Sequence, residues 1–140
     1  MFKRERRRFK RIILEKKHSV VINSIGSQIS YSLKTRNISI DGLFLECENP
    51  ERVPFTPSSL IEAHLDIDEG EFVFFNIKIV HFVLPQDNKA TLWGPGFGVK
   101  IVQISKEDKI RLESFVQLHA EAMEGQNSDS GAVNYKVSNL

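Results

Sequence analysis

The densest potential for chemistry in this chain lies at its start, in the arginine block Arg4-Glu5-Arg6-Arg7-Arg8-Phe9-Lys10-Arg11. The spacing R-x-x-x-R is met by Arg7 and Arg11, and also by Arg4 and Arg8. An arginine side chain is a planar, permanently charged fork that can grip a phosphate, donate to guanine O6 and N7, or stack on a base. The block therefore predicts a phosphate-bearing ligand, a nucleic acid or an acidic surface, and by itself it equally fits a solvated basic tail.

A second polar motif follows about 26 residues later, in Asn37-Ile38-Ser39-Ile40-Asp41-Gly42, and reads D/N-x-S-x-x-G. Asn and Ser side chains bond to nearby backbone groups and stabilise turns, and Gly allows a backbone to come close to a ligand. The residues predict either a plain hairpin turn or a turn that presents polar groups to a ligand. The same letters contain the glycosylation sequon Asn37-Ile38-Ser39, which we discount because nothing routes the chain through a secretory pathway.

Charge is distributed unevenly along the 140 residues. Residues 1–17 hold nine Lys and Arg against two Glu, a local charge of +7, whereas the rest holds ten basic against sixteen acidic residues, so the net charge is only +1. The positive charge is thus concentrated in an N-terminal arm, residues 1–11. The single cysteine, Cys47, excludes an internal disulfide and fits a reducing cytoplasm. No apolar run follows the N-terminal charges, so we expect neither a secretory signal nor membrane insertion.

The middle of the chain has the alternating pattern of short strands. Apolar and polar residues alternate over 29–33, 61–67 and 72–84, and Glu69-Gly70 predicts a hairpin tip between the last two segments. Further strands are expected at 12–14, 19–22, 43–46 and 97–104. Several short strands followed by one helix predict an all-β domain that closes, or nearly closes, into a barrel.

One helix is expected at the end of this domain. Ser105 is a suitable N-cap, with Asp108 three residues later as its capping partner. Gly125 predicts the end of the helix. Residues 125–140 are polar and aperiodic, so we expect a disordered tail behind the arm 1–11 and the domain 12–124. One helical face then carries Leu112, Phe115, Val116, His119 and Met123.

In this order, the two motifs resemble those of the PilZ family, small β-barrels that bind the bacterial second messenger cyclic diguanylate (c-di-GMP). The segment Gly96-Phe97-Gly98-Val99-Lys100-Ile101 also resembles the Gly-x-Gly closing strand common in that family. The resemblance covers roughly residues 6–116. It implies a six-stranded antiparallel barrel followed by a C-terminal α-helix.

The resemblance also implies a role for the arginines. In the family the arginine pair stands directly before the first barrel strand, which favours Arg7 and Arg11 because Arg11 precedes the apolar segment 12–14. Arg6 corresponds to the additional arginine that often precedes the pair. These side chains are expected to bind the phosphates and guanines of c-di-GMP.

The second motif is expected to hold the ligand from the barrel side. Carried over from the family, Asn37 accepts a hydrogen bond from the guanine edge, Ser39 bonds near the base or phosphate, and Gly42 preserves the turn. Where the family has Asp, the Asn here offers a neutral acceptor, which lowers the strength of that contact.

The implied function is that of a cytoplasmic c-di-GMP receptor without catalytic activity. Ligand binding is expected to order the N-terminal arm on the barrel and so to create a surface for a protein effector. Two alternatives stay open, a PilZ-like adaptor that binds protein without nucleotide and a nucleic-acid-binding small barrel. The latter is disfavoured because the barrel segment is acidic and lacks a strip of exposed aromatic and arginine residues.

Other reactive residues form no recognisable site in the sequence. His64 and Asp66 stand two apart on one predicted strand, and His81 lies on the next strand. These three could bind a metal, but we expect solvent-facing side chains there. His18 and His119 have no evident partner. The sequence therefore predicts a binding protein with no metal and no cofactor other than its nucleotide ligand.

Overall fold

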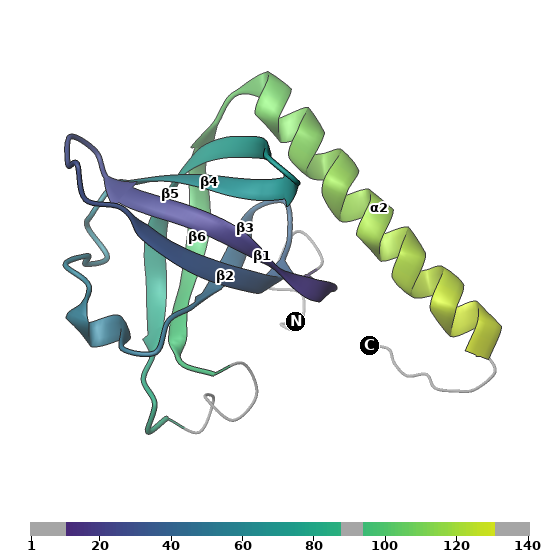
Figure 1. Ribbon diagram of the computed structural model, residues 1–140, viewed down its shortest axis with the longest axis horizontal. Helices are drawn as coiled ribbons and strands as arrows, with labels where there is room; N and C mark the ends of the chain where they lie inside the picture. The colour runs from purple at the N-terminus through teal and green to yellow at the C-terminus, as the bar shows by residue number, and fades with distance from the viewer. Residues whose placement is uncertain (1–10, 88–93, 131–140) are drawn as a thin grey trace, which may run out of the picture.

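The computed structural model describes residues 11–87 and 94–130, with the backbone alone described for 121–130. Six strands form a closed barrel in the order β1-β2-β3-β6-β5-β4, with antiparallel neighbours throughout. A long helix follows and lies along one side of the barrel (Figure 1). The expected six-stranded antiparallel barrel with a C-terminal helix is confirmed. The elements are β1 Ile12–Ser24, β2 Tyr31–Ile38, β3 Gly42–Glu46, the short 3-10 helix η1 Pro50–Arg52, β4 Ile61–Asp68, β5 Glu71–Val83, β6 Gly96–Ile104 and α2 Lys106–Ser130.

The core lies inside the barrel because alternate residues of each strand point inward. On β4 and β5 the burial alternates regularly, so that Leu65 and Val73 are buried while their neighbour Phe74 is exposed. This inward and outward alternation also decides which polar side chains reach the surface of the barrel. Fully buried members of the core are Val20, Ile38, Leu43, Leu45, Ile61, Leu65, Val73, Ile77 and Phe97.

The first strand is longer than the sequence pattern indicated. The segments expected at 12–14 and 19–22 form one strand, β1, and the charged residues between them do not interrupt it. The pairing with β2 shifts between Ile13, opposite Asn37, and His18, opposite Thr35. This bulge places extra residues on β1 and leaves residues 15–17 exposed. Their charged side chains therefore stay in solvent, and no charge has to be buried. A charged run therefore lies within a strand rather than between two.

Turn chemistry is as expected at the β4–β5 hairpin. Glu69 and Gly70 both have positive φ, 34° and 92°, at the tip between β4 and β5. Such a turn favours Gly, and it matches the twist of the two flanking strands. The hairpin tip carries Asp68, Glu69 and Glu71 close to the start of α2.

Helix α2 begins as the sequence predicts but ends later. The backbone N–H of Asp108 donates to Ser105 Oγ at 3.1 Å, and Ser105 Oγ donates to the Asp108 carboxylate at 3.0 Å. The expected end at Gly125 is wrong, because the helical backbone continues to Ser130. Glycine within a helix costs only about 1 kcal/mol relative to Ala, so it permits an end without forcing one. The predicted tail residues 131–140 and the side chain of Met123 lie outside the described part.

The buried face of α2 matches the expected one. Leu112 is fully buried, Phe115 is 6% exposed, and Val116 and Ala120 pack against the core. Among the residues that the structure describes, no helix has the combination of length and apolar character that crossing a bilayer requires. The helix is therefore fastened to the barrel by the side chains of its first half.

Candidate ligand-binding site

The end of the arginine block and the start of the turn motif are in direct contact. Arg11 lies just before β1, and its Nη1 donates to Asn37 Oδ1 at 3.1 Å, across 26 positions in the chain. Ile12 and Ile38 are opposite one another and point inward, so the residues next to them, Arg11 and Asn37, point outward. The structure thus brings together two of the residues expected to form the site. Arg6 and Arg7 lie outside the described residues.

The turn between β2 and β3 uses Ser39 as an internal brace. Its backbone N–H donates to the Gly42 carbonyl at 2.8 Å, and its hydroxyl donates to Asp41 Oδ1 at 2.5 Å. The side chain of Ser39 is completely buried. The hydroxyl shapes the turn, and its contact with a ligand stays a prediction.

Gly42 is required by the close approach of neighbouring backbone. It lies opposite Lys100 on β6, and a Cβ atom at this position would stand only 2.6 Å from the Val99 carbonyl oxygen. The same Cβ would be 3.7 Å from Arg11 Nη2. The guanidinium of Arg11 therefore lies beside Asn37 and over Gly42. We call the surface formed by Arg11, Asn37 and Gly42 the motif face.

The two glycines of β6 make room for rings on the outside of the barrel. Gly98 is opposite both Phe44 on β3 and His81 on β5, and a Cβ at Gly98 would collide with the His81 ring. A Cβ at Gly96 would collide with the Leu45 carbonyl and come within 3.0 Å of the Phe44 ring. The Gly-x-Gly segment thus leaves space on the outer side of β6 beside the motif face, and the Phe44 and His81 rings occupy this space.

Two lysines continue the motif face, and neither was singled out in the sequence. Lys100 is opposite Gly42 across the β3–β6 pair, and Lys78 is opposite Lys100 across the β5–β6 pair. Both side chains are exposed. Only the register of three strands reveals this neighbourhood, because the residues are far apart in the chain. We call Gly42, Lys100 and Lys78 the lysine row.

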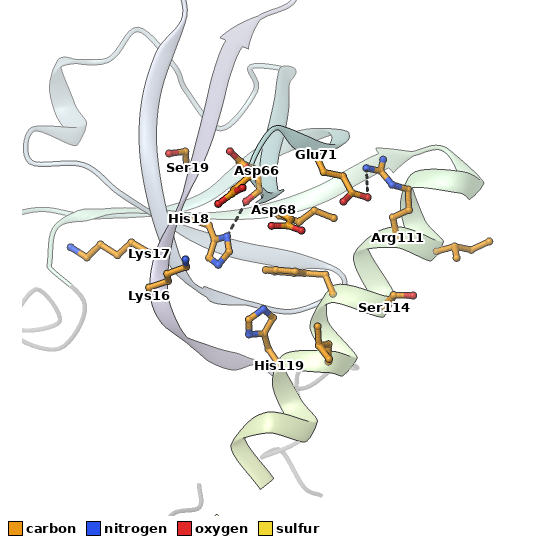
Figure 2. Close-up of a pocket in the computed structure, with 15 residues that line it drawn as sticks. Lys16, Lys17, His18, Ser19, Asp66, Asp68, Glu71, Arg111, Ser114 and His119 are labelled. Atoms are coloured by element: carbon orange, nitrogen blue, oxygen red, sulfur yellow. Dashed lines mark hydrogen bonds and ion pairs between the residues drawn. The ribbon is translucent and has the colours of Figure 1, made fainter. Parts of the chain in front are cut away.

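A hollow lies between the first half of α2 and the barrel (Figure 2). This helix groove has a volume of about 700 Å³ and is bounded by β1 residues 16–19, the β4–β5 hairpin and α2. Arg111 pairs with Asp108 at 2.9 Å and with Glu71 at 3.5 Å, which ties the helix to the hairpin. Phe115 lines the groove and belongs to the buried core.

The prediction that His18 and His119 have no evident partner is wrong, because α2 brings them together. His18 Nδ1 donates to the Asp66 carbonyl at 2.9 Å, and its ring centroid lies 5.2 Å from that of Phe115 and 6.0 Å from that of His119. Burial lowers the pKa of His119, the neighbouring His18 lowers it further, and Glu15 opposes both effects. These contacts hold the helix in place and have no counterpart in a local motif.

The remaining reactive residues are engaged structurally. His64 packs against Phe72 and Phe74 on the outside of β4 and β5, with ring centroids 5.1 and 5.3 Å away. Within residues 11–87 and 94–130, no three His, Cys, Asp or Glu side chains gather as metal ligands would. The pKa of Cys47 is raised, mainly by burial, which disfavours the nucleophilic thiolate.

Several solved structures have the same fold. The PilZ domain of YcgR from Escherichia coli with c-di-GMP has a TM-score of 0.62 at 12% identity, covering 89% of this chain and 98% of that chain. The K. pneumonia MrkH–c-di-GMP complex has a TM-score of 0.64 at 16% identity, and the Bacillus subtilis inhibitor of motility MotI/DgrA has 0.63 at 13%. Both matches cover 89% of this chain, but only 55% of the MrkH chain and 57% of the MotI chain. This chain therefore spans little more than half the length of each of those two proteins.

No curated protein matched the sequence. A profile of the PilZ domain family, in contrast, matches residues 5–118. The match includes the arginine block from Glu5 onward, the turn motif and all six strands, and it ends within α2. With the barrel order and the convergent motif face, this match shows that the chain belongs to the PilZ domain family.

Proposed function

We propose that this protein is a receptor for c-di-GMP. The observation that carries the proposal is the contact of Arg11 with Asn37 and its position over Gly42, because it unites three motif residues on one outward face. The family membership supports the proposal. So do the solved structures of the YcgR PilZ domain and of MrkH with c-di-GMP, which share the fold. The proposed role is binding, not catalysis, and it takes place in the cytoplasm.

Each proposed contact has a chemical reason. The ligand carries two phosphodiester charges and two guanines. The guanidinium groups of Arg6, Arg7 and Arg11 can bind either the phosphates or the guanine edges. Asn37 offers a carbonyl oxygen to the guanine N–H groups. Gly42 carries no side chain of its own, which lets the ligand approach the barrel closely.

Binding exchanges one set of contacts for another, and this exchange is the proposed switch. Arg11 Nη1 donates to Asn37 Oδ1, and in the proposed switch both groups turn toward the nucleotide when it binds. Ordering each arm residue costs roughly 1–2 kcal/mol, which the arginine contacts have to offset. The ordered arm and the ligand form a new surface for a protein effector.

The direct test is a calorimetric titration of the purified protein with c-di-GMP, with GTP and cyclic di-AMP as controls. Selective binding is expected. Arg11→Ala removes contacts of a charged group that are worth about 1.5–3 kcal/mol, so affinity should fall roughly 10- to 150-fold. The matched control is Arg52→Ala, at an exposed arginine in η1, which should bind like wild type.

The same titration can overturn the proposal. If no heat of binding appears with ligand up to about 100 μM, any binding free energy must be less favourable than roughly −5.5 kcal/mol. That result would exclude the receptor and leave an adaptor that binds protein without nucleotide. Equal affinity of Arg7→Ala, Arg11→Ala and wild type would show that the ligand binds elsewhere.

A further inference from the structure

The lysine row is an unusual arrangement of charge on a sheet. Lys100 and Lys78 are directly opposite on adjacent antiparallel strands, and both point outward between inward residues of the core. Neighbouring strands lie about 4.8 Å apart, so the row extends roughly 10 Å from Gly42 across β6 to β5. Like charges that face each other across a strand pair destabilise the sheet.

Nothing in the described part of the chain compensates this repulsion. The ion pairs there involve other cations: Lys17 with Glu46 at 2.8 Å, and Arg111 with Asp108 and Glu71. Asp41, whose carbonyl accepts from the Ile101 N–H beside Lys100, directs its carboxylate to the Ser39 hydroxyl. The two lysines therefore form a site of positive charge next to the motif face, with no carboxylate partner among the residues that the structure describes.

We propose that Lys100 and Lys78 bind a phosphate of the cyclic dinucleotide, on the side of the ligand that faces away from Arg11. This inference rests on the proposed function and extends its site from β1, β2 and β3 to β6 and β5. A lysine ammonium on its flexible stem is a compact charge that suits a phosphodiester. A bound anion between the two lysines would also remove the cost of their repulsion.

The test compares c-di-GMP affinity in the double variant Lys78→Gln/Lys100→Gln with that in wild type. We expect affinity to fall about tenfold at low salt, and the difference to shrink as salt rises because mobile ions screen exposed charges. Lys16→Gln is the matched control, since Lys16 is an exposed strand lysine on β1 with no ion pair in the described residues. It should leave affinity unchanged.

A charge reversal separates ligand binding from a structural role. Lys100→Glu places a carboxylate opposite Lys78, so thermal stability should be equal to or higher than that of wild type, whereas affinity should fall further than in the Gln variants. A structural role alone would instead change stability and affinity in the same direction.

The outcomes distinguish the two proposals. If wild type binds c-di-GMP and Arg11→Ala binds it more weakly, but the lysine variants bind like wild type, the lysine inference is overturned and the receptor stands. If wild type does not bind, both fall. A loss of affinity in the lysine variants that equals the loss in Lys16→Gln would also overturn the inference, since it would reflect net charge only.

Discussion

The motif face and the helix groove are two regions of one barrel, and they are built on opposite principles. On the motif face, Arg11, Asn37 and Gly42 come from short sequence motifs and converge because strand register places them together. In the helix groove, His18 and His119 belong to no motif, and they contact each other and Phe115 because α2 packs on the barrel. The first region is expected to decide ligand binding and the second to decide how firmly α2 is held, so each can be changed without the other.

The largest expected effect tests this separation from the helix side. Phe115→Ala removes a ring that is 6% exposed, and the free energy of unfolding should fall by about 3–5 kcal/mol. Affinity for c-di-GMP should stay as in wild type. Urea unfolding and calorimetry measure the two quantities. Leu118→Ala is the control on the same helix, because this side chain is 63% exposed and should change stability by less than about 0.5 kcal/mol. A large loss of affinity in Phe115→Ala would show that the regions are coupled.

A single methyl group on the motif face should affect both stability and binding. Gly42→Ala drives a Cβ against the Val99 carbonyl and toward Arg11, so stability should fall by about 1–3 kcal/mol and c-di-GMP affinity should fall with it. Gly98→Ala meets the His81 ring instead, and a side chain can move more easily than a backbone carbonyl. Its loss of stability should be smaller. Melting curves of the two variants compare them, and equal losses would contradict the role assigned to Gly42.

A change of charge at Asn37 should sharpen the binding side of the comparison. Asn37→Asp replaces a neutral acceptor with a carboxylate, and charge-assisted hydrogen bonds are roughly twice as strong. We expect c-di-GMP to bind about three- to tenfold more tightly, a gain on the order of 1 kcal/mol. Asn37→Ala, titrated alongside, should bind more weakly than wild type. Tighter binding by both variants would show that Asn37 obstructs the ligand rather than holding it.

The smallest expected effect is a pH dependence confined to the helix groove. Because burial lowers the pKa of His119 in the folded state, the unfolded chain binds more protons once the pH falls below the ordinary histidine pKa. Stability should therefore decrease from pH ~7.5 to pH ~5.5, as the pH passes the unfolded value and approaches the lowered folded one. In His119→Gln part of this decrease should disappear, whereas His64→Gln should keep it. Identical pH profiles for wild type and His119→Gln would contradict this origin.

Much of the barrel follows from sequence pattern, and the exceptions have local causes. Alternation predicted β4 and β5, and Glu69-Gly70 predicted the hairpin between them, because a half-buried strand and a tight turn each impose residue types over a few positions. The continuous β1 was not foreseen, since a bulge lets residues 15–17 stay in solvent within a strand. The extension of α2 beyond Gly125 was not foreseen either, because glycine is a weak helix terminator.

The sequence by itself determined the residue chemistry of this protein: the arginine block, the turn motif and the glycines of the closing strand are local patterns, and they indicate a family and a ligand class. Only the tertiary structure decided which of these groups meet. The contact of Arg11 with Asn37, the row of Gly42, Lys100 and Lys78, and the ring contact of His18 with His119 all join residues distant in the chain. Strand register and helix packing set such contacts, and a shift of one residue would turn every side chain of a strand to the other face.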